Sequence, residues 1–358
     1  MFSVIVFPAP GLDDYTFHFV NALSAFARVG YIIDAKQRDR FGNALSSAIT
    51  PIVFHRPRRR HLWGAGEMYK LSRAIKHFHP DIFHLQGDGL WESVLLRLLG
   101  DIPVINTVHD PVKHIDYQNI LNNTFLQDAI RRAKGWVVHS EGLKRILIRE
   151  YRLNSDRVLV HPLGIHDYYC RFSTDVNSPR EKYILFFGEP RFNKGFDLLL
   201  KAFSSIKDRI DDWKIVAAGK GNFISGIEKY IDPPGSRIFF ENRYITDTEV
   251  ATLFSRAGIV ALPYRHASQS GVLGIAAAFG CPVLATPVGN MSEIMEHGKN
   301  VFFVKPNDEQ SLAEGLITMA QSEGLRARLG NNLKGLASSQ WSWDDIARVS
   351  VDFYSRML

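Results

Sequence analysis

The sequence has few cysteines and no long apolar run. Only Cys170 and Cys281 occur in 358 residues, which excludes a disulfide framework or a cysteine-based zinc site. No stretch approaches the roughly 18 apolar residues that a membrane-spanning helix needs. The segment Met1–Phe7 lacks a basic leader and is too short for a signal peptide, so we expect it to form a buried strand. These features predict a cytoplasmic protein.

Several motifs of catalysis and cofactor binding are also missing. No Gly-x-Gly-x-x-Gly follows a predicted strand, because the loop at Gly219-Lys220-Gly221 has no third glycine at the required spacing. The P-loop lysine motif, His-Glu-x-x-His, Gly-x-Ser-x-Gly and an Asp-x-Asp metal clamp do not occur. The sequence therefore disfavours nicotinamide and flavin enzymes and predicts chemistry with no resident cofactor and no metal ion.

What the chain has in excess is positive charge in its first half. The formal net charge is +6, and basic residues gather at 55–61 and in a helical pattern with Lys70, Arg73 and Lys76. A solvated basic face explains this as well as an anionic partner does. A second basic helix, with Lys144 among its cations, supports a peripheral location on an anionic membrane. Nucleic acid is not expected as a partner, because no zinc finger, basic zipper or aromatic RNA motif occurs.

Short runs of β-branched and aromatic residues alternate with helical patterns along nearly the whole chain. This alternation is typical of an α/β fold in which crossover helices connect parallel strands. The expected strands are Phe2–Phe7, Tyr31–Asp34, Ile52–His55, Ile82–Leu85, Val104–Val108, Gly135–His139, Val158–His161, Tyr183–Phe187, Lys214–Ala217, Arg237–Phe240, Ile259–Leu262, Pro282–Ala285 and Val301–Val304. The expected helices include Tyr15–Arg28, closed by Gly30, and Glu67–Phe78, closed before Pro80.

The length and a polar stretch indicate two domains. A single core stops growing at roughly 250 residues, so 358 residues fit two α/β domains. Residues 173–180 have the composition of a linker, and the strand pattern restarts after them. We therefore expect domains at 1–168 and 169–340, with a final helix at 341–358 that packs back onto the first domain.

The strongest candidate site lies in the second half, where two loops follow predicted strands. The segment Ser268–Gly274 leads into an apolar helix whose first amides, near Ser270, Gly271 and Val272, could bind an anion. Taken alone, this segment is explained more simply by a plain serine N-cap. The loop after the first strand of the same domain carries Arg191 and Lys194. Loops at the carboxyl ends of parallel strands meet in one crevice, so together they predict a diphosphate site.

In the first half, His109 ends a predicted buried strand. A neutral imidazole at this edge can hydrogen-bond a sugar hydroxyl, although an ordinary loop histidine beside Asp110 has the same sequence signal. The loop from Pro8 to Asp14 is the matching glycine-bearing turn, with Gly11 at its centre. It could contact the donor phosphates or the acceptor, or simply form the turn.

In the order and spacing of its predicted strand ends and loops, the chain resembles the retaining glycosyltransferases of family 4, which have the GT-B fold. The resemblance covers essentially the whole chain and rests on these segments: His79–His84, Thr107–Asp110, Val137–Glu141, Val160–Ile165, Lys194–Leu199, Ala257–Pro263, Phe279–Thr286 and Val288–Ile294. It implies two Rossmann-like parallel-sheet domains that face an interdomain cleft. The family carries two glutamates around the phosphate loop, where this chain has Ala267 and Ile275, and Glu189 stands where the family often has arginine.

The resemblance implies roles for the candidate residues. His109 would contact the transferred sugar as the catalytic-site residue. The residues expected to bind the donor are Arg191, Lys194, Gln269, Ser270, Gly271, Val272, Gly11 and Tyr244. The leaving phosphate would itself assist deprotonation of the acceptor.

The predicted function is transfer of a hexose from a nucleoside diphosphate sugar, with a UDP-sugar as the expected donor. The acceptor would be a hydroxyl of a glycan or a lipid-linked molecule, in the assembly of a surface polysaccharide or glycolipid. Two alternatives remain. The missing glutamates favour a catalytically silent binding subunit of the same fold, and a related enzyme could epimerise or hydrolyse the nucleotide sugar.

Overall fold

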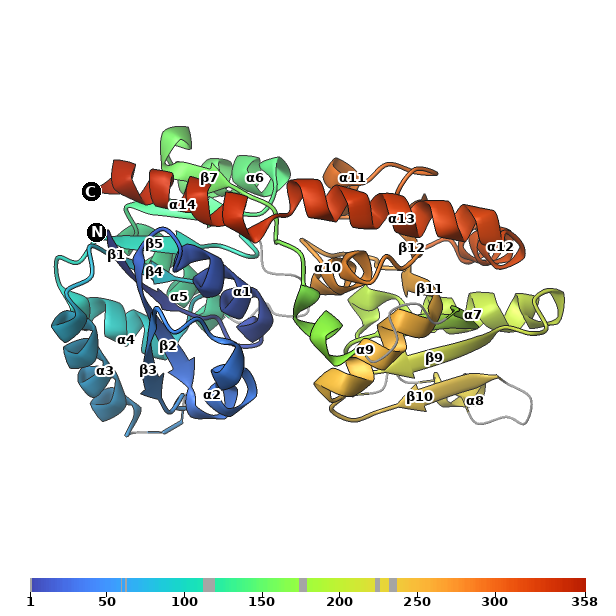
Figure 1. Cartoon of the computed structure of the whole chain (residues 1–358), viewed down its shortest axis with the longest axis horizontal. Helices are drawn as coiled ribbons and strands as arrows, with labels where there is room; N and C mark the ends of the chain where they lie inside the picture. Colours follow the sequence, from blue (N-terminus) through green and yellow to red (C-terminus); the bar gives the residue numbers. More distant parts are fainter. Residues whose placement is uncertain are drawn as a thin grey trace. The chain divides into compact units, whose positions relative to one another are not determined.

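The computed structural model describes residues 2–58, 60–61, 63–111, 120–173, 179–222, 226–231 and 237–358. The chain folds into two compact units. Unit 1 comprises Met1–Pro162 and Trp343–Leu358, and unit 2 comprises Leu163–Ser342. Both are α/β units built on parallel sheets (Figure 1). Within the described ranges, no helix is both long and apolar enough to cross a membrane.

In unit 1, the strands are joined in the order β3-β2-β1-β4-β5-β6-β7, and the recorded pairs are all parallel. The strands are β1 Ser3–Phe7, β2 Arg28–Asp34, β3 Ile49–Phe54, β4 Ile82–Leu85, β5 Val104–Thr107, β6 Gly135–Val138 and β7 Val158–Val160. The helices are α1 Asp13–Leu23, α2 Ala35–Phe41, α3 Gly64–Phe78, α4 Leu90–Leu99, α5 Ile120–Arg132, α6 Glu141–Tyr151 and α14 Trp343–Met357.

Unit 2 repeats this plan with the order β10-β9-β8-β11-β12-β13. Its strands are β8 Glu181–Phe187, β9 Lys214–Ala218, β10 Ile238–Glu241, β11 Ala257–Leu262, β12 Val283–Ala285 and β13 Phe302–Phe303. Its helices are α7 Phe196–Ile206, α8 Glu228–Ile231, α9 Asp247–Arg256, α10 Gly271–Ala278, α11 Met291–Ile294, α12 Glu309–Gln321 and α13 Glu323–Gln340. Strand β11 is buried along its whole length and β8 is buried from Tyr183 to Phe186, which explains the apolar sequences of these stretches.

The division between the units falls earlier than the sequence boundary after residue 168. Residues Leu163 onward belong to unit 2 because the short 3₁₀ helix Asp167–Phe172 packs against α9 and α10. Of the expected linker, residues 174–178 lie outside the described residues. The last helix, α14, belongs to unit 1, where it packs on α1 (Figure 1).

One helix prediction was wrong at its end. Helix α1 stops at Leu23 and β2 begins at Arg28, so Gly30 lies inside a strand and does not cap a helix. The reason is packing: a Cβ at Gly30 would lie 2.7 Å from Cγ1 of Ile5 on the neighbouring strand β1. The glycine therefore serves close approach inside the sheet.

Each sheet reverses its strand order once, and the carboxyl ends of strands at such a point form a natural crevice. In unit 1 the reversal lies between β1 and β4, and in unit 2 it lies between β8 and β11. The loops that follow these strands carry most of the residues that the sequence singled out.

Candidate functional site

A cavity of about 330 Å³ lies at the reversal point of unit 1. It is lined by Ala9, Pro10, Leu12, Gly87, Asp88, Asn106, Thr107, Val108, His109, Asp110 and Leu126. The loops after β1, β4 and β5 supply most of these residues. Asn106 is 1% exposed, and neither atom of its side-chain amide has a hydrogen-bond partner within the described residues. A buried amide of this kind favours a polar occupant for the cavity.

His109 lies in this cavity wall, just beyond the carboxyl end of β5. Burial, and then the neighbouring His161, lower its pKa to about 3, so the ring is neutral at physiological pH. Gly11 occupies the adjacent loop with a φ of 80°, and a Cβ there would meet no atom within 4 Å. Backbone conformation, and not crowding, therefore favours glycine at this position.

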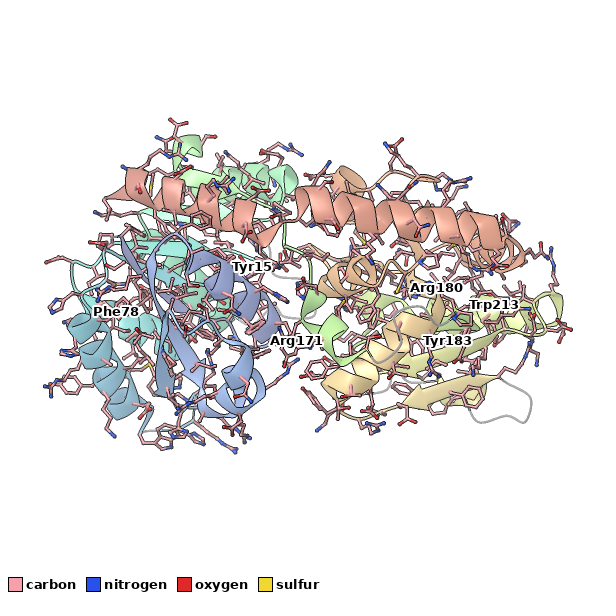
Figure 2. All side chains as sticks on the ribbon, viewed as in Figure 1. Tyr15, Phe78, Arg171, Arg180, Tyr183 and Trp213 are labelled. Atoms are coloured by element: carbon pink, nitrogen blue, oxygen red, sulfur yellow. The ribbon has the colours of Figure 1, made fainter. Side chains whose placement is uncertain are left out.

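His109 is part of a buried cluster of histidines that the sequence prediction missed. Its Nδ1 lies 3.1 Å from Nε2 of His139, and Nδ1 of His139 lies 3.2 Å from the carbonyl oxygen of His161. Tyr15 of α1, which is labelled in Figure 2, packs against the rings of His109 and His139, with centroid separations of 5.5 and 5.4 Å. The cluster has four rings, those of His84, His109, His139 and His161, which lie at or just beyond the carboxyl ends of β4, β5, β6 and β7. The recurrence of a histidine at neighbouring strand ends was the signal available in the sequence.

Helix α14 contributes to the same cluster. The hydroxyl of Tyr354 lies 2.6 Å from Nδ1 of His84, and Nε2 of His84 lies 2.6 Å from the hydroxyl of Thr107. Burial lowers the pKa of His84 to about 3 and that of His161 to about 4. The final helix thus helps to hold the floor of the cavity in a neutral, hydrogen-bonded state.

Arg56 departs from the solvated basic face that the sequence suggested. Its guanidinium forms an ion pair of 2.7 Å with Glu92 and donates to the carbonyl oxygen of Pro8 at 2.7 Å. The same group lies over the rings of Phe7 and Phe54, at 5.0 and 5.3 Å from their centroids. Arg56 therefore supports the loop after β1 and is only partly exposed.

In unit 2, the loops after β8 and β11 meet through one tyrosine. Nζ of Lys194 lies 3.4 Å from the hydroxyl of Tyr264 and 4.5 Å from the centroid of its ring. The Tyr264 hydroxyl lies 3.2 Å from the hydroxyl of Ser270, the N-cap of α10. The structure thus brings Lys194 and Ser270 together. Tyr264 is not among the residues that the sequence singled out.

A second pair of residues fixes the two loops against each other. Arg265 forms a bidentate ion pair with Asp197, at 2.7 and 2.8 Å, and donates to the carbonyl oxygen of Phe192. At the point of closest approach, a Cβ on Gly195 would lie 2.0 Å from the carbonyl oxygen of Pro263. Only glycine fits there, and its φ of 69° agrees with that. Nothing in the sequence indicated that Arg265 and Asp197 would pair.

The first turn of α10 has the features of an anion site. The Ser270 side chain accepts from the amide of Leu273 at 3.4 Å, which leaves Gly271 and Val272 among the amides without an intrahelical acceptor. Gln269 is half-buried directly before this turn. The ring of His166 packs beside the helix, since a Cβ on Gly274 would lie 2.8 Å from its Cδ2. Lys194 adds a positive charge near this turn, because its Nζ contacts the Tyr264 hydroxyl, which in turn contacts the hydroxyl of Ser270.

Two further predicted donor residues have exposed side chains. Arg191 is exposed and forms an ion pair of 2.5 Å with Glu189 on its own loop. Tyr244 is 65% exposed on the loop after β10. That loop contacts the loop after β9, because the amide of Gly221 donates to Oδ1 of Asn242 at 3.0 Å. The carbonyl oxygen of Arg191 accepts from the amide of Lys194 at 2.9 Å, so the two predicted cations lie in one turn of the loop after β8.

Two family models match the chain. Residues 11–167 match the model described as glycosyltransferase family 4, and residues 181–322 match that of the glycosyl transferases group 1. The two matched segments correspond closely to unit 1 and unit 2.

The chain also resembles individual proteins. An uncharacterised glycosyltransferase of Methanocaldococcus jannaschii is 31% identical over 228 residues, which cover 60% of this chain and 58% of that protein. The match thus spans less than two thirds of that relative. The D-inositol 3-phosphate glycosyltransferase of Xylanimonas cellulosilytica is 23% identical over 317 residues, covering 79% and 72%. The structure of Anabaena HepE in complex with UDP-glucose has a TM-score of 0.75 at 16% identity over 99% of both chains. From its two family models and its paired parallel-sheet units, we conclude that the chain belongs to the GT-B glycosyltransferases.

Proposed function

We propose that this chain is a retaining glycosyltransferase of family 4 that transfers a hexose from a nucleoside diphosphate sugar, with a UDP-sugar as donor. The acceptor is a hydroxyl of a glycan or lipid-linked molecule, in polysaccharide or glycolipid assembly. The observation that carries the proposal is the contact of Lys194, Tyr264 and Ser270 at the strand reversal of unit 2. That position suits a diphosphate, because a cation and helix-terminal amides occur together there.

The chemistry follows from the charge of the leaving group. As the bond from sugar to phosphate breaks, negative charge grows on the leaving diphosphate. Fixed hydrogen-bond donors and cations stabilise this charge more than they stabilise the intact nucleotide sugar. In the proposal, Lys194 and the amides of Gly271 and Val272 supply this stabilisation. His109 contacts a hydroxyl of the transferred sugar, and Tyr244 and Arg191 contact the rest of the donor.

The test is a transfer assay with the full chain, a panel of nucleoside diphosphate sugars and hydroxyl acceptors. We expect product with retained anomeric configuration by proton NMR, in the presence of EDTA as well as without it. Thermal stabilisation by the matching nucleoside diphosphate is also expected, since a ligand of the folded state raises its stability. Stabilisation without turnover would instead indicate a silent binding subunit. Donor consumption without acceptor would indicate an epimerase or hydrolase.

We further propose that a basic and aromatic face of unit 1 binds anionic membranes. Trp63 and Tyr69 are 50% and 57% exposed at the start of α3, and Lys70 and Arg73 are exposed on the same helix. Aromatic rings beside cations are typical of surfaces that rest in the headgroup region. A location at the inner face of the membrane would bring the enzyme to a lipid-linked acceptor.

The double variant Lys70→Glu with Arg73→Glu is expected to weaken binding to phosphatidylserine-containing vesicles by roughly 30-fold or more, because each cation contributes about 1 kcal/mol. Cosedimentation at rising salt measures this effect. The matched control is Lys201→Glu with Arg328→Glu, two exposed cations of unit 2. Binding that resists salt, or that is lost equally in the control, would contradict the proposal.

A further inference from the structure

The histidine cluster of unit 1 contains a directional chain of hydrogen bonds that ends at His109. The chain runs from the carbonyl oxygen of His161 to Nδ1 of His139, and from Nε2 of His139 to Nδ1 of His109. His139 is 2% exposed and His161 is 3% exposed. Because solvent is largely excluded, these contacts decide which ring nitrogens carry protons.

The proton positions follow from the chemistry of each partner. A backbone carbonyl oxygen only accepts, so Nδ1 of His139 must carry a proton. Burial, together with the neighbouring rings of His109 and His161, holds the pKa of His139 well below its ordinary value, so this ring is neutral. Its Nε2 therefore carries a lone pair and accepts from His109. Nδ1 of His109 is then the protonated nitrogen, and Nε2 of His109 is an acceptor.

We propose that His139 is a positioning residue, which holds His109 in the Nδ1-protonated tautomer so that Nε2 accepts a hydrogen bond from a hydroxyl group in the unit 1 cavity. The identity of that hydroxyl as one of a sugar rests on the proposed function. The tautomer itself does not rest on it. A cationic His139 would donate from both nitrogens and reverse the polarity of His109.

The surroundings of the two rings oppose such a reversal. Among the residues that the structure describes, His161 and Tyr15 contact these rings, and His84 with Tyr354 lies one ring farther. Asp88 and Asp110 line the same cavity as His109. Within the described part of the chain, the partners of His139 are His109, His161 and Tyr15, and none of them is a carboxylate that could stabilise an imidazolium. The edge of Tyr15, at 90° to the ring of His109 and 72° to that of His139, further restricts ring rotation. Neutral rings in fixed orientations are what a permanent acceptor requires.

The test uses the full chain with ¹⁵N-labelled histidine. Long-range ¹H–¹⁵N correlation spectra at pH 7.5 distinguish a protonated ring nitrogen from one with a lone pair, and His109→Asn identifies the signals of His109. In the parent protein we expect Nδ1 of His109 to be protonated and Nε2 to be bare. In His139→Phe, which keeps the ring volume but removes the acceptor, we expect a shift of His109 toward the Nε2-protonated form.

The variant His139→Gln provides the conservative comparison, because its amide oxygen can accept from His109. We expect it to keep the parent tautomer, and its melting temperature shows that the fold is intact. An Nε2-protonated His109 in the parent, or an unchanged tautomer in a folded His139→Phe, would overturn the proposal. Should His139→Phe not fold, the parent spectrum and that of His139→Leu decide the question in the same way.

Kinetics separate this inference from the function on which it partly rests. With an active enzyme, His139→Phe should lower kcat roughly 10-fold or more, while nucleoside diphosphate still stabilises the variant as it does the parent. His139→Gln should recover most of the activity. Absence of all turnover in the parent would defeat the proposed function and leave the NMR result standing. An active parent with the opposite tautomer would defeat the inference alone.

Discussion

Replacing Lys194 with alanine is expected to lower kcat for sugar transfer by about 100- to 1000-fold, the loss seen when one preorganised donor to a developing anion is removed. The side chain lies over Tyr264 and contacts its hydroxyl, so it is held where α10 begins. Because charge on the leaving diphosphate grows in the transition state, the loss should fall more on kcat than on KM.

Steady-state rates and the affinity for nucleoside diphosphate measure the effect. Lys194→Arg should retain part of the activity, because it keeps the charge but not the point-like geometry. Lys201→Ala removes an exposed cation from α7 and should behave like the parent. Arg191→Ala should have the smaller effect of the two predicted cations, since Glu189 already neutralises it. Full activity of Lys194→Ala would refute the diphosphate site.

Acidification from pH 6.5 to 4.5 is expected to unfold unit 1. The pKa of His84 and His109 falls to about 3 and that of His161 to about 4 in the folded chain, mainly through burial, against an ordinary value of 6.5. The pKa of His139 is lowered in the same direction. Below pH 6.5 the unfolded chain therefore binds protons that the folded chain does not bind. Stability that is fully present above pH 6.5 is lost as the pH falls toward the folded pKa values.

One carboxyl group of the same unit acts in the opposite direction. Burial, and then the charge of Asp14, raise the pKa of Asp13 to about 6, so the folded chain holds a proton there between about pH 6 and 4 that the unfolded chain releases. Four histidines outweigh one aspartate. Each net proton corresponds to about 1.4 kcal/mol per pH unit, so the free energy of unfolding should fall by roughly 4 kcal/mol per unit. The free energy of unfolding of an ordinary domain is about 5 to 15 kcal/mol, so a loss of this size over two pH units removes a large part of it.

Guanidinium unfolding at a series of pH values measures this slope. His139→Gln removes one titrating ring from the cluster and should reduce the slope by about one proton. His77→Gln removes an exposed histidine from α3 and should leave the slope unchanged. A free energy of unfolding that is flat between pH 6.5 and 4.5 would show that the buried rings are already protonated in the folded chain.

Most of the strand plan could be predicted from the sequence. The expected strand at Ile82–Leu85 coincides with β4, and the others overlap the observed strands with small differences at their ends. Buried parallel strands have to be apolar on both faces, so their sequences are continuous and easy to find. The end of α1 could not be predicted in this way, because Gly30 has the same local pattern as a helix cap. Only its contact with Ile5 shows that it belongs to a strand.

The candidate site was predictable as a set of loops but not as a set of contacts. Topology alone indicated that the loops of Lys194 and Ser270 would share a crevice. The position of Tyr264 between them depends on side-chain geometry that no spacing rule contains. Arg265 and Asp197 are likewise far apart in sequence and meet only because Gly195 lets the two loops approach.

The sequence by itself determined the parallel α/β architecture, the two units and the loops that carry polar chemistry, because apolar periodicity and glycine placement are local properties. The tertiary structure decided which of those polar residues meet. His109 and His139 follow the neighbouring strands β5 and β6. Their rings touch because the register and pleat of these strands place both side chains at the same edge of the sheet. Long-range contacts of this kind leave no local pattern, so the protonation state of His109 could be inferred only from the fold.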